Sequence, residues 1–420
     1  MSARPSRRFN ERSILEFLKF KESLLILSTA AFLPYFASGM IAAFIMVWLR
    51  RLGASFLEVG VVNAFSNLAL AISFLAGGTL SDSYGGKKVF FSGLILTLFS
   101  TILYGVAGLV FAWAFVALGL ILGRVAVGFR ETSSFSIIYD VAEERKRATS
   151  FGLLSTFRQM GYVVGPSVGG LIAYLVGLRG PFLLAPPLVF VAILLTSLKL
   201  ELVKVRPTKL KFSVQEIKDV LASSPGVASL ILISLWDQFF LEMGNPFYMI
   251  FLDEEFKAPH YMLGLCFTVM SASTLAFSMV GGISSDIARR RKPFIVLGAA
   301  LMALSVGFVA FAVDPWMFVA SYSLAGVSMA ISNTAIPSYF TDALRERAST
   351  VFGLRLGLMY IVGTFAPPIS GWLIQEFGSL RIPFLINFVG SSIEILLLIF
   401  FFKESLEGAL KGARLPEPPL

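Results

Sequence analysis

The chain is poor in the residues that build covalent cross-links and metal sites. Among 420 residues it has a single cysteine, Cys266, and a single histidine, His260. One cysteine excludes an internal disulfide and a thiolate metal cluster, and one histidine excludes sites built from several imidazoles. No G-x-x-x-x-G-K-[ST] phosphate loop occurs. With no Ser-His-Asp or Cys-His set either, we expect neither an enzyme nor a bound cofactor.

Charge is also scarce: 15% of the residues are charged and 56% are hydrophobic. A soluble domain of this size could not bury so much apolar surface, so we expect lipid to surround most of it. No signal peptide is expected, because the first 23 residues are basic and polar. Twelve segments are long and apolar enough to span a bilayer: 24–49, 57–80, 89–110, 112–139, 148–175, 181–199, 226–251, 261–285, 293–312, 316–341, 349–374 and 382–402.

The distribution of lysine and arginine predicts the orientation in the membrane. If the N-terminus is cytoplasmic, 26 of the 35 basic residues lie on cytoplasmic segments and five lie outside. This asymmetry follows the positive-inside rule and places both termini in the cytoplasm. It also explains the net charge of +9 without a nucleic-acid partner. We therefore expect a multi-pass protein of the cytoplasmic membrane, in contact with lipid, and we expect a monomer.

The longest interior loop divides the chain into two halves of six spans each. We expect a cytoplasmic N-terminal segment, two all-α bundles, a linker between them and a cytoplasmic tail, with the bounds 1–23, 24–199, 200–225, 226–402 and 403–420. Ser213 and Glu216 form a capping-box pattern in the linker. An amphipathic helix on the inner membrane face is predicted there, and another is predicted at 14–22.

A short motif returns after 204 residues, at the end of an apolar run in each half. Gly78 to Asp82 is repeated as Gly282 to Asp286, and Gly60 and Gly264 keep the same offset. Each aspartate lies at the C-terminal end of its helix, where the macrodipole disfavours a carboxylate. We therefore expect it to meet a positive group in one conformation only, as a cytoplasmic gate does. The predicted gate residues are Gly78, Asp82, Gly85, Lys87, Lys88, Gly282, Asp286 and Arg289.

The fifth predicted span carries a stripe of glycines. Gly161, Gly165 and Gly169 recur at every fourth residue, so they share one helix face. Such a face lets another helix pack backbone to backbone, and Pro166 removes one helical hydrogen bond. The whole packing motif is Gly152, Gly161, Gly165, Pro166, Gly169 and Gly170.

These motifs resemble those of the major facilitator superfamily, and the chain looks most like its twelve-span drug:proton antiporters. The repeated loop resembles the family's G-x-x-x-D-R-x-G-R-K loop, with Ser83 and Gly86 in place of two basic residues. The glycine stripe is similar to the family's antiporter motif. Leu120, Arg124 and Gly128 resemble its fourth-span signature, whose arginine is implicated in proton transfer. The resemblance implies two six-helix bundles related by a pseudo-two-fold axis and an alternating-access transporter.

Charged residues inside the predicted spans are the candidate substrate and proton site, because charge at this depth is costly and usually functional. Glu131 lies seven residues after Arg124, on the same helix face. Arg130 points elsewhere. Glu394 lies in a span that is peripheral in the family, so we expect a lipid-facing or supporting role. The predicted site residues are Arg124, Glu131, Arg158, Asp237, Glu242 and Arg355.

The first hypothesis is proton-coupled export of a small, largely apolar molecule, driven by the proton gradient. Glu131 or Asp237 would exchange protons, with Arg124 tuning the carboxylate. The first span has no acidic residue, whereas many proton-coupled multidrug exporters that this chain resembles carry one. The alternative is therefore uptake or exchange of an organic anion clamped by Arg124 and Arg158, with Arg355 as a third candidate for the clamp. A non-transporting membrane receptor or scaffold is a remote third hypothesis.

Overall fold

The computed structural model describes residues 22–141, 147–199, 224–288, 290–344 and 348–404. The predicted amphipathic helices at 14–22 and 200–225 lie almost wholly outside these ranges. Twelve helical segments follow the twelve predicted spans. The first six are formed by α2 (Glu22–Ala42) with α3 (Ile45–Arg51), α4 (Phe56–Tyr84), α5 (Gly86–Val110), α6 (Trp113–Val141), α7 (Arg147–Val176) and α8 (Arg179–Lys199).

The second six repeat this order. They are formed by α10 (Pro225–Gly244), η2 (Asn245–Phe247) and α11 (Tyr248–Glu254), then α12 (His260–Ala288), α13 (Lys292–Ala310), α14 (Trp316–Leu344), α15 (Ala348–Gly363) with α16 (Ala366–Phe377), and α17 (Ile382–Phe400). Ten of these spans pass a test of length and hydropathy, and the bent pair α2–α3 makes an eleventh. The remaining helix, α14, is not among these spans. Its 29 residues are long enough to cross the membrane, and its sequence contains several serines, which lower its hydropathy. The prediction of an all-α membrane fold is confirmed.

Three predicted spans are broken rather than continuous. The axis turns by 45° between α2 and α3, and a short 3-10 segment containing Pro246 separates α10 from α11. The break between α15 and α16 is followed by Pro367 and Pro368. Proline lacks the N–H that would continue the helical ladder, which accounts for the second and third breaks. Inside a membrane protein, such breaks occur where the backbone is buried in protein or lines a cavity.

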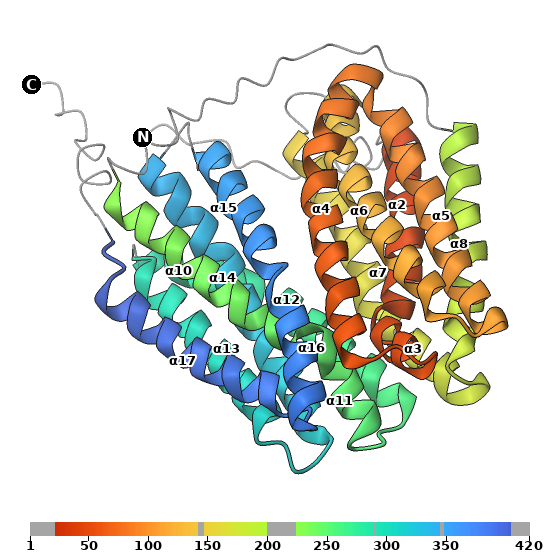
Figure 1. The fold of residues 1–420 in the computed structure, drawn as a ribbon. Helices are drawn as coiled ribbons and strands as arrows, with labels where there is room; N and C mark the ends of the chain where they lie inside the picture. The colour runs from red at the N-terminus through yellow and green to blue at the C-terminus, as the bar shows by residue number, and fades with distance from the viewer. Residues whose placement is uncertain (1–21, 142–146, 200–223, 289, 345–347, 405–420) are drawn as a thin grey trace, which may run out of the picture.

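The two halves pack together at one end of the molecule and diverge toward the other (Figure 1). We name these the α3–α11 end and the Asp82–Asp286 end. Near the first end a Cβ atom on Gly60 of α4 would collide with Pro367 of α16, and one on Gly264 of α12 would collide with Pro166 of α7. The second contact is the repeat-equivalent of the first. Missing side chains thus let the halves touch backbone to backbone.

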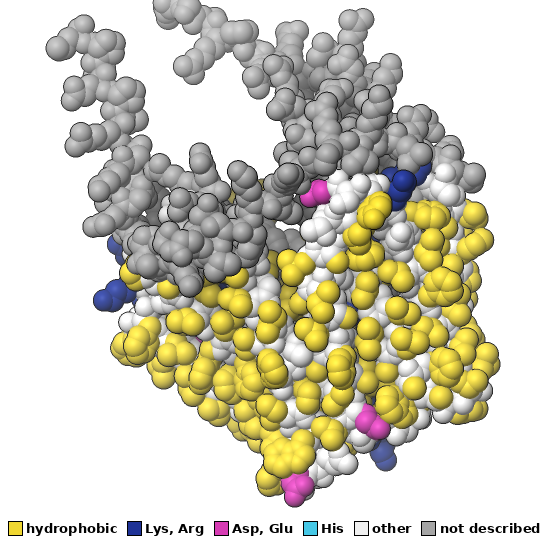
Figure 2. Space-filling view, turned by 45° about the horizontal axis from the view of Figure 1, so that its top comes forward, with side chains coloured by type: hydrophobic (Ala, Val, Ile, Leu, Met, Phe, Trp, Pro, Cys, Tyr) yellow, Lys and Arg dark blue, Asp and Glu magenta, His cyan; other side chains and the backbone are white. Residues whose placement is uncertain are grey.

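Hydrophobic side chains cover the outside of the helices, and the described charges on the face in Figure 2 are confined to its edges. Large apolar residues such as Leu75, Met279 and Leu175 are more than two-thirds exposed. This distribution is expected where hydrocarbon replaces water as the solvent. The polar interior must therefore lie between the helices.

Candidate functional site

Two cavities lie where the halves face each other. The first-half cavity, of about 300 Å³, is lined mainly by α2, α5 and α6. The second-half cavity, of about 450 Å³, is lined mainly by α10, α14 and α15. Arg124 and Asn245 line both cavities. Asp237, Glu242 and Arg355 line the second one, so four of the six predicted site residues meet at its wall.

Glu131 and Arg158 form a separate cluster in the first half. An Arg158 Nη1 donates to Glu131 Oε2 at 2.5 Å, and the Tyr35 hydroxyl donates to the other carboxylate oxygen. The ion-pair partner of Glu131 is Arg158 and not Arg124, which we expected to tune the exchanging carboxylate. Seven residues separate Arg124 from Glu131 by about 10 Å along the helix, whereas α7 brings Arg158 alongside.

Arg130 belongs to the same cluster, although helix periodicity predicted that its side chain points away from Glu131. Its guanidinium lies 4.7 Å from the centre of the Tyr35 ring, and that of Arg158 lies 5.3 Å from it. Arg130 is only 1% exposed, and it lines the first-half cavity. Its position deep in the predicted span could have identified it as a site residue. Helix periodicity could not show that the Tyr35 ring of α2 lies beside it.

The second half contains a carboxyl pair that the sequence reasoning also missed. The Asp237 and Glu394 side chains lie close enough to interact directly, and both line the second-half cavity together with Arg355. Arg355 Nε donates to the Ser234 hydroxyl at 2.8 Å. Of the two roles expected for Glu394, lipid-facing or supporting, the lipid-facing one is wrong, because this residue is 8% exposed and lines the cavity.

Glu242 connects the two halves through neutral donors. Asn67 of α4 donates to its Oε2 at 3.0 Å, while Gln238 and Asn245 donate to its Oε1 at 3.0 and 3.2 Å. Glu242 is 5% exposed. Because Asn67 is on the first half and Glu242 on the second, this hydrogen bond must break if the halves separate at this depth.

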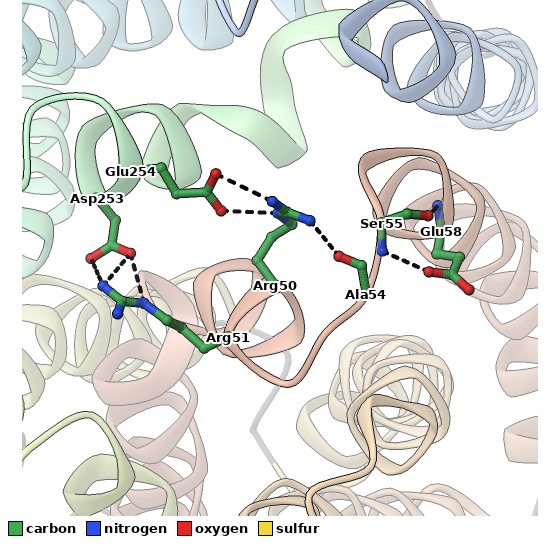
Figure 3. A network of polar contacts seen from close by, with 7 residues as sticks. All are labelled: Arg50, Arg51, Ala54, Ser55, Glu58, Asp253 and Glu254. Atoms are coloured by element: carbon green, nitrogen blue, oxygen red, sulfur yellow. Dashed lines mark hydrogen bonds and ion pairs between the residues drawn. The ribbon is translucent and has the colours of Figure 1, made fainter. Parts of the chain in front are cut away.

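The α3–α11 end is closed by ion pairs between the halves (Figure 3). Arg50 Nε lies 2.9 Å from Glu254 Oε1, and Arg51 Nη2 lies 2.9 Å from Asp253 Oδ2. Asp253 is 3% exposed. We call this set the end lock. From the sequence, Arg50 and Arg51 were expected only to contribute to the orientation of the chain in the membrane.

A signal for the end lock was present in the sequence. Arg50 and Glu254 are 204 residues apart, which is also the offset of the repeated glycine motif. A residue and its repeat-equivalent can touch only near the pseudo-two-fold axis. Opposite charges at equivalent positions beside the tip of a span therefore predict a bridge across that axis.

At the Asp82–Asp286 end, the two copies of the gate motif differ. Asp286 pairs with Arg291 at 2.6 Å, and Arg291 also pairs with Asp342 of α14 at 3.0 Å. Burial acts to lower the pKa of Arg291, but the two carboxylates outweigh it and raise the pKa overall. No ion pair joins Asp82 to another described residue, and Arg289 lies outside the described ranges.

The glycines of the gate motif have open surroundings in this conformation. A Cβ atom on Gly78 would meet nothing within 4 Å, and one on Gly282 would meet only Thr334 at 3.8 Å. Gly85 has φ = +93° and joins α4 to α5 in a sharp turn. Lys88 is exposed and Lys87 is half-buried at the start of α5.

The glycine motif of α7 faces two partners. A Cβ atom on Gly161 would lie 2.8 Å from Phe36 N, and one on Gly165 would lie 2.6 Å from Phe36 O. Gly169 faces Met40 of the same helix, α2. Gly170 instead faces α12 of the other half, and Pro166 lies beside both Gly39 of α2 and Gly264 of α12. A Cβ atom on Gly152 would meet nothing within 4 Å.

These observations define a class of protein: a polytopic membrane transporter made of two repeated helical halves about a central polar cavity. The family model of the Major Facilitator Superfamily matches residues 27–241 and 227–419. The chain belongs to that superfamily, as its motifs predicted.

Curated relatives match over shorter lengths. An uncharacterised MFS-type transporter of Methanocaldococcus jannaschii is 26% identical over 203 residues, 47% of this chain and 51% of the relative. The quinolone resistance protein NorA of Staphylococcus aureus is 27% identical over 175 residues, 42% of this chain and 44% of NorA. The matched region thus spans about half the length of each relative.

Two solved structures share the fold over nearly their whole length. The nucleoside transporter NupG has a TM-score of 0.75 at 15% identity, covering 91% of this chain and 99% of NupG. A D-xylose-proton symporter has a TM-score of 0.66 at 14% identity, covering 91% and 97%. At such identities the likeness establishes the fold alone.

Proposed function

We propose that this chain is a proton-coupled secondary transporter that exports a small organic molecule from the cytoplasm by alternating access. The observation that carries the coupling is the contact between Asp237 and Glu394 in a cavity between the halves. Two carboxyl groups held this close together in a buried cavity repel each other when both are ionised, so one of them favours the protonated form. The pair therefore holds one proton that it can release when the cavity changes sides.

Arg355 supplies the charge balance for this step. It lines the same cavity and interacts electrostatically with both carboxyl groups. When the pair loses its proton, the second negative charge is stabilised by the nearby guanidinium. The Tyr35–Glu131–Arg158 cluster is a second candidate proton site, because its carboxylate is also held between a hydroxyl donor and a guanidinium.

Export is the direction that the NorA likeness supports, since that relative is named for drug resistance. The end lock supports a conformation closed at the α3–α11 end. If the positive-inside prediction is correct, that end faces outward and the cavities are reached from the cytoplasm. A molecule in the cytoplasm would therefore bind to the conformation seen here.

The proposal is tested with purified protein in liposomes that contain a trapped pH dye. Adding dyes, nucleosides, sugars, amino acids or carboxylic acids identifies the solute that moves protons in the wild type. We expect Glu131→Gln and Asp237→Asn each to reduce this movement about tenfold or more, the scale of a lost proton-transfer group. Glu376→Gln, at an exposed carboxylate, is the control. A full response in both site variants would refute the coupling.

Uptake or exchange of an organic anion remains the second candidate. The observation that favours it is Arg124, which lines both cavities and forms no ion pair with any described residue. The three-arginine clamp expected from the sequence is not assembled, since Arg158 lines neither cavity and is paired with Glu131. Coupled entry of an acid and a proton into empty liposomes would distinguish uptake from export.

A further inference from the structure

The two cavities differ in the charged groups that line them. Among the described residues, the first-half cavity is lined by two arginines, Arg124 and Arg130, and by no carboxylate. The second-half cavity is lined by three carboxyl residues and two arginines. Because a cavity of low dielectric strengthens the field of its lining charges, the first-half cavity attracts anions, whereas the carboxyl groups of the second-half cavity can hold protons.

The hydrogen bonds of Arg130 are incomplete. Its Nε and Nη1 have no hydrogen-bond partner in the part of the chain that the structure describes. The nearest carboxylate, Glu131, already accepts from Arg158 and Tyr35. The Tyr35 ring covers the face of the Arg130 guanidinium but cannot accept from its edge. A buried guanidinium without acceptors is costly, and an anion in the cavity would remove that cost.

The rest of the lining fits an apolar body. Ile41, Met46, Leu120, Val127 and Phe267 contribute side chains to the wall of the first-half cavity. Ligand pockets of this kind hold an apolar molecule by its surface and orient it through a few polar groups. A wholly hydrophilic anion would leave these side chains poorly matched, whereas an amphiphilic acid would use both parts.

We propose that the first-half cavity binds the carboxylate of an amphiphilic organic acid through Arg130 and Arg124. This assignment rests on the transport function proposed above and names the substrate class. The unpartnered Nε–H and Nη1–H of Arg130 can each donate a charge-assisted hydrogen bond to an anion. The bound acid and the protonated Asp237–Glu394 pair would then occupy neighbouring cavities, which meet at Arg124 and Asn245.

The test compares two ligands of the same shape, 2-naphthoate and the neutral 2-naphthylmethanol. Equilibrium dialysis against the detergent-purified full-length protein measures the affinity for each, with empty detergent micelles subtracted. We expect the wild type to bind naphthoate at least tenfold more tightly than the alcohol, the scale of charge-assisted hydrogen bonds. Equal affinity for the two ligands would overturn the proposal without any variant.

Variants then assign the site. Arg130→Gln and Arg124→Gln should each lower naphthoate affinity about tenfold or more and leave the alcohol unchanged, and Arg130→Lys should restore part of the loss. Arg179→Gln removes a positive charge from an exposed position and is the charge-matched control. Equal losses for acid and alcohol would mean that Arg130 only supports the fold, and the proposal would fail. If Arg130→Gln does not fold, the half-buried Arg124 carries the test.

Failure of this proposal is distinguishable from failure of the proposed function. Selective, Arg130-dependent naphthoate binding without any proton movement in liposomes would support the anion site and contradict proton coupling. Proton movement that responds only to neutral or cationic solutes would support coupling and overturn the anion site.

Discussion

At the scale of single residues, the buried charges act in groups rather than alone. Glu131 is shared by Arg158 and Tyr35, and Asp237 is paired with Glu394. A pair of carboxyl groups in contact titrates as one unit. The residue whose role changes most is Glu394, which the sequence assigned to the periphery and the structure places on the cavity wall.

The pairing predicts a matching phenotype for the two acids. Glu394→Gln should reduce substrate-driven proton movement in liposomes as strongly as Asp237→Asn does. The double variant should be little worse than either single variant, because members of one unit are not additive. If Glu394→Gln instead matched the exposed control Glu376→Gln, the pair would not be the coupling site.

At the scale of helices, the α7 glycines make close packing possible. Gly161, Gly165 and Gly169 lie against the backbone of α2, and Gly170 lies against α12 of the other half. One helix therefore makes both a contact within its half and a contact across the halves. The stripe was readable from sequence spacing, but the second partner was not, since Gly169 and Gly170 are neighbours on the chain and face different helices.

Replacing a glycine of α7 by alanine should affect stability differently at a closely packed position and at an open one. Gly165→Ala would bring its methyl 2.6 Å from the Phe36 carbonyl oxygen, and we expect a loss of about 1–3 kcal/mol from overpacking. Gly152→Ala meets nothing within 4 Å and should be neutral or stabilising by up to about 1 kcal/mol through helix propensity. Thermal unfolding in detergent, followed by circular dichroism, compares the two. Equal midpoints would contradict the close contact with α2.

At the scale of the whole molecule, the halves are joined at the α3–α11 end and apart at the other (Figure 1). The end lock places Arg50 and Arg51 of the first half on acids of the second (Figure 3). Breaking a pair that leaves Asp253 buried and uncompensated is unfavourable. The lock therefore favours the present conformation over one that is open at this end.

Removing the lock should shift the conformational equilibrium. Gly78→Cys, in a Cys266→Ser background, places a thiol where a Cβ atom has open space in the present conformation. We expect Arg51→Ala to slow its reaction with a water-soluble maleimide several-fold, because closure of the Asp82–Asp286 end would cover it. Arg179→Ala, at an exposed arginine, is the control. Unchanged labelling in Arg51→Ala would show that the lock does not set the equilibrium.

The amino-acid sequence alone was sufficient to predict the class of fold. Hydropathy predicted the twelve segments, and the 204-residue repeat divided them into halves. Both are properties of the sequence that do not depend on tertiary contacts. The motif residues led to the superfamily for the same reason. The break between α15 and α16 was not predicted, although Pro367 and Pro368 mark it in the sequence. The break at 43–44 has no proline beside it, so the sequence carries no local signal for it.

Which charged side chains meet could be learned only from the packing of the helices. Helix periodicity shows that Arg124 and Glu131 share a face, yet Glu131 meets Arg158, Asp237 meets Glu394, and Arg51 meets Asp253. The partner of a buried charge depends on the tilt and rotation of neighbouring helices, which are set by packing against one another. These orientations involve residues far apart in the chain, so no local pattern contains them.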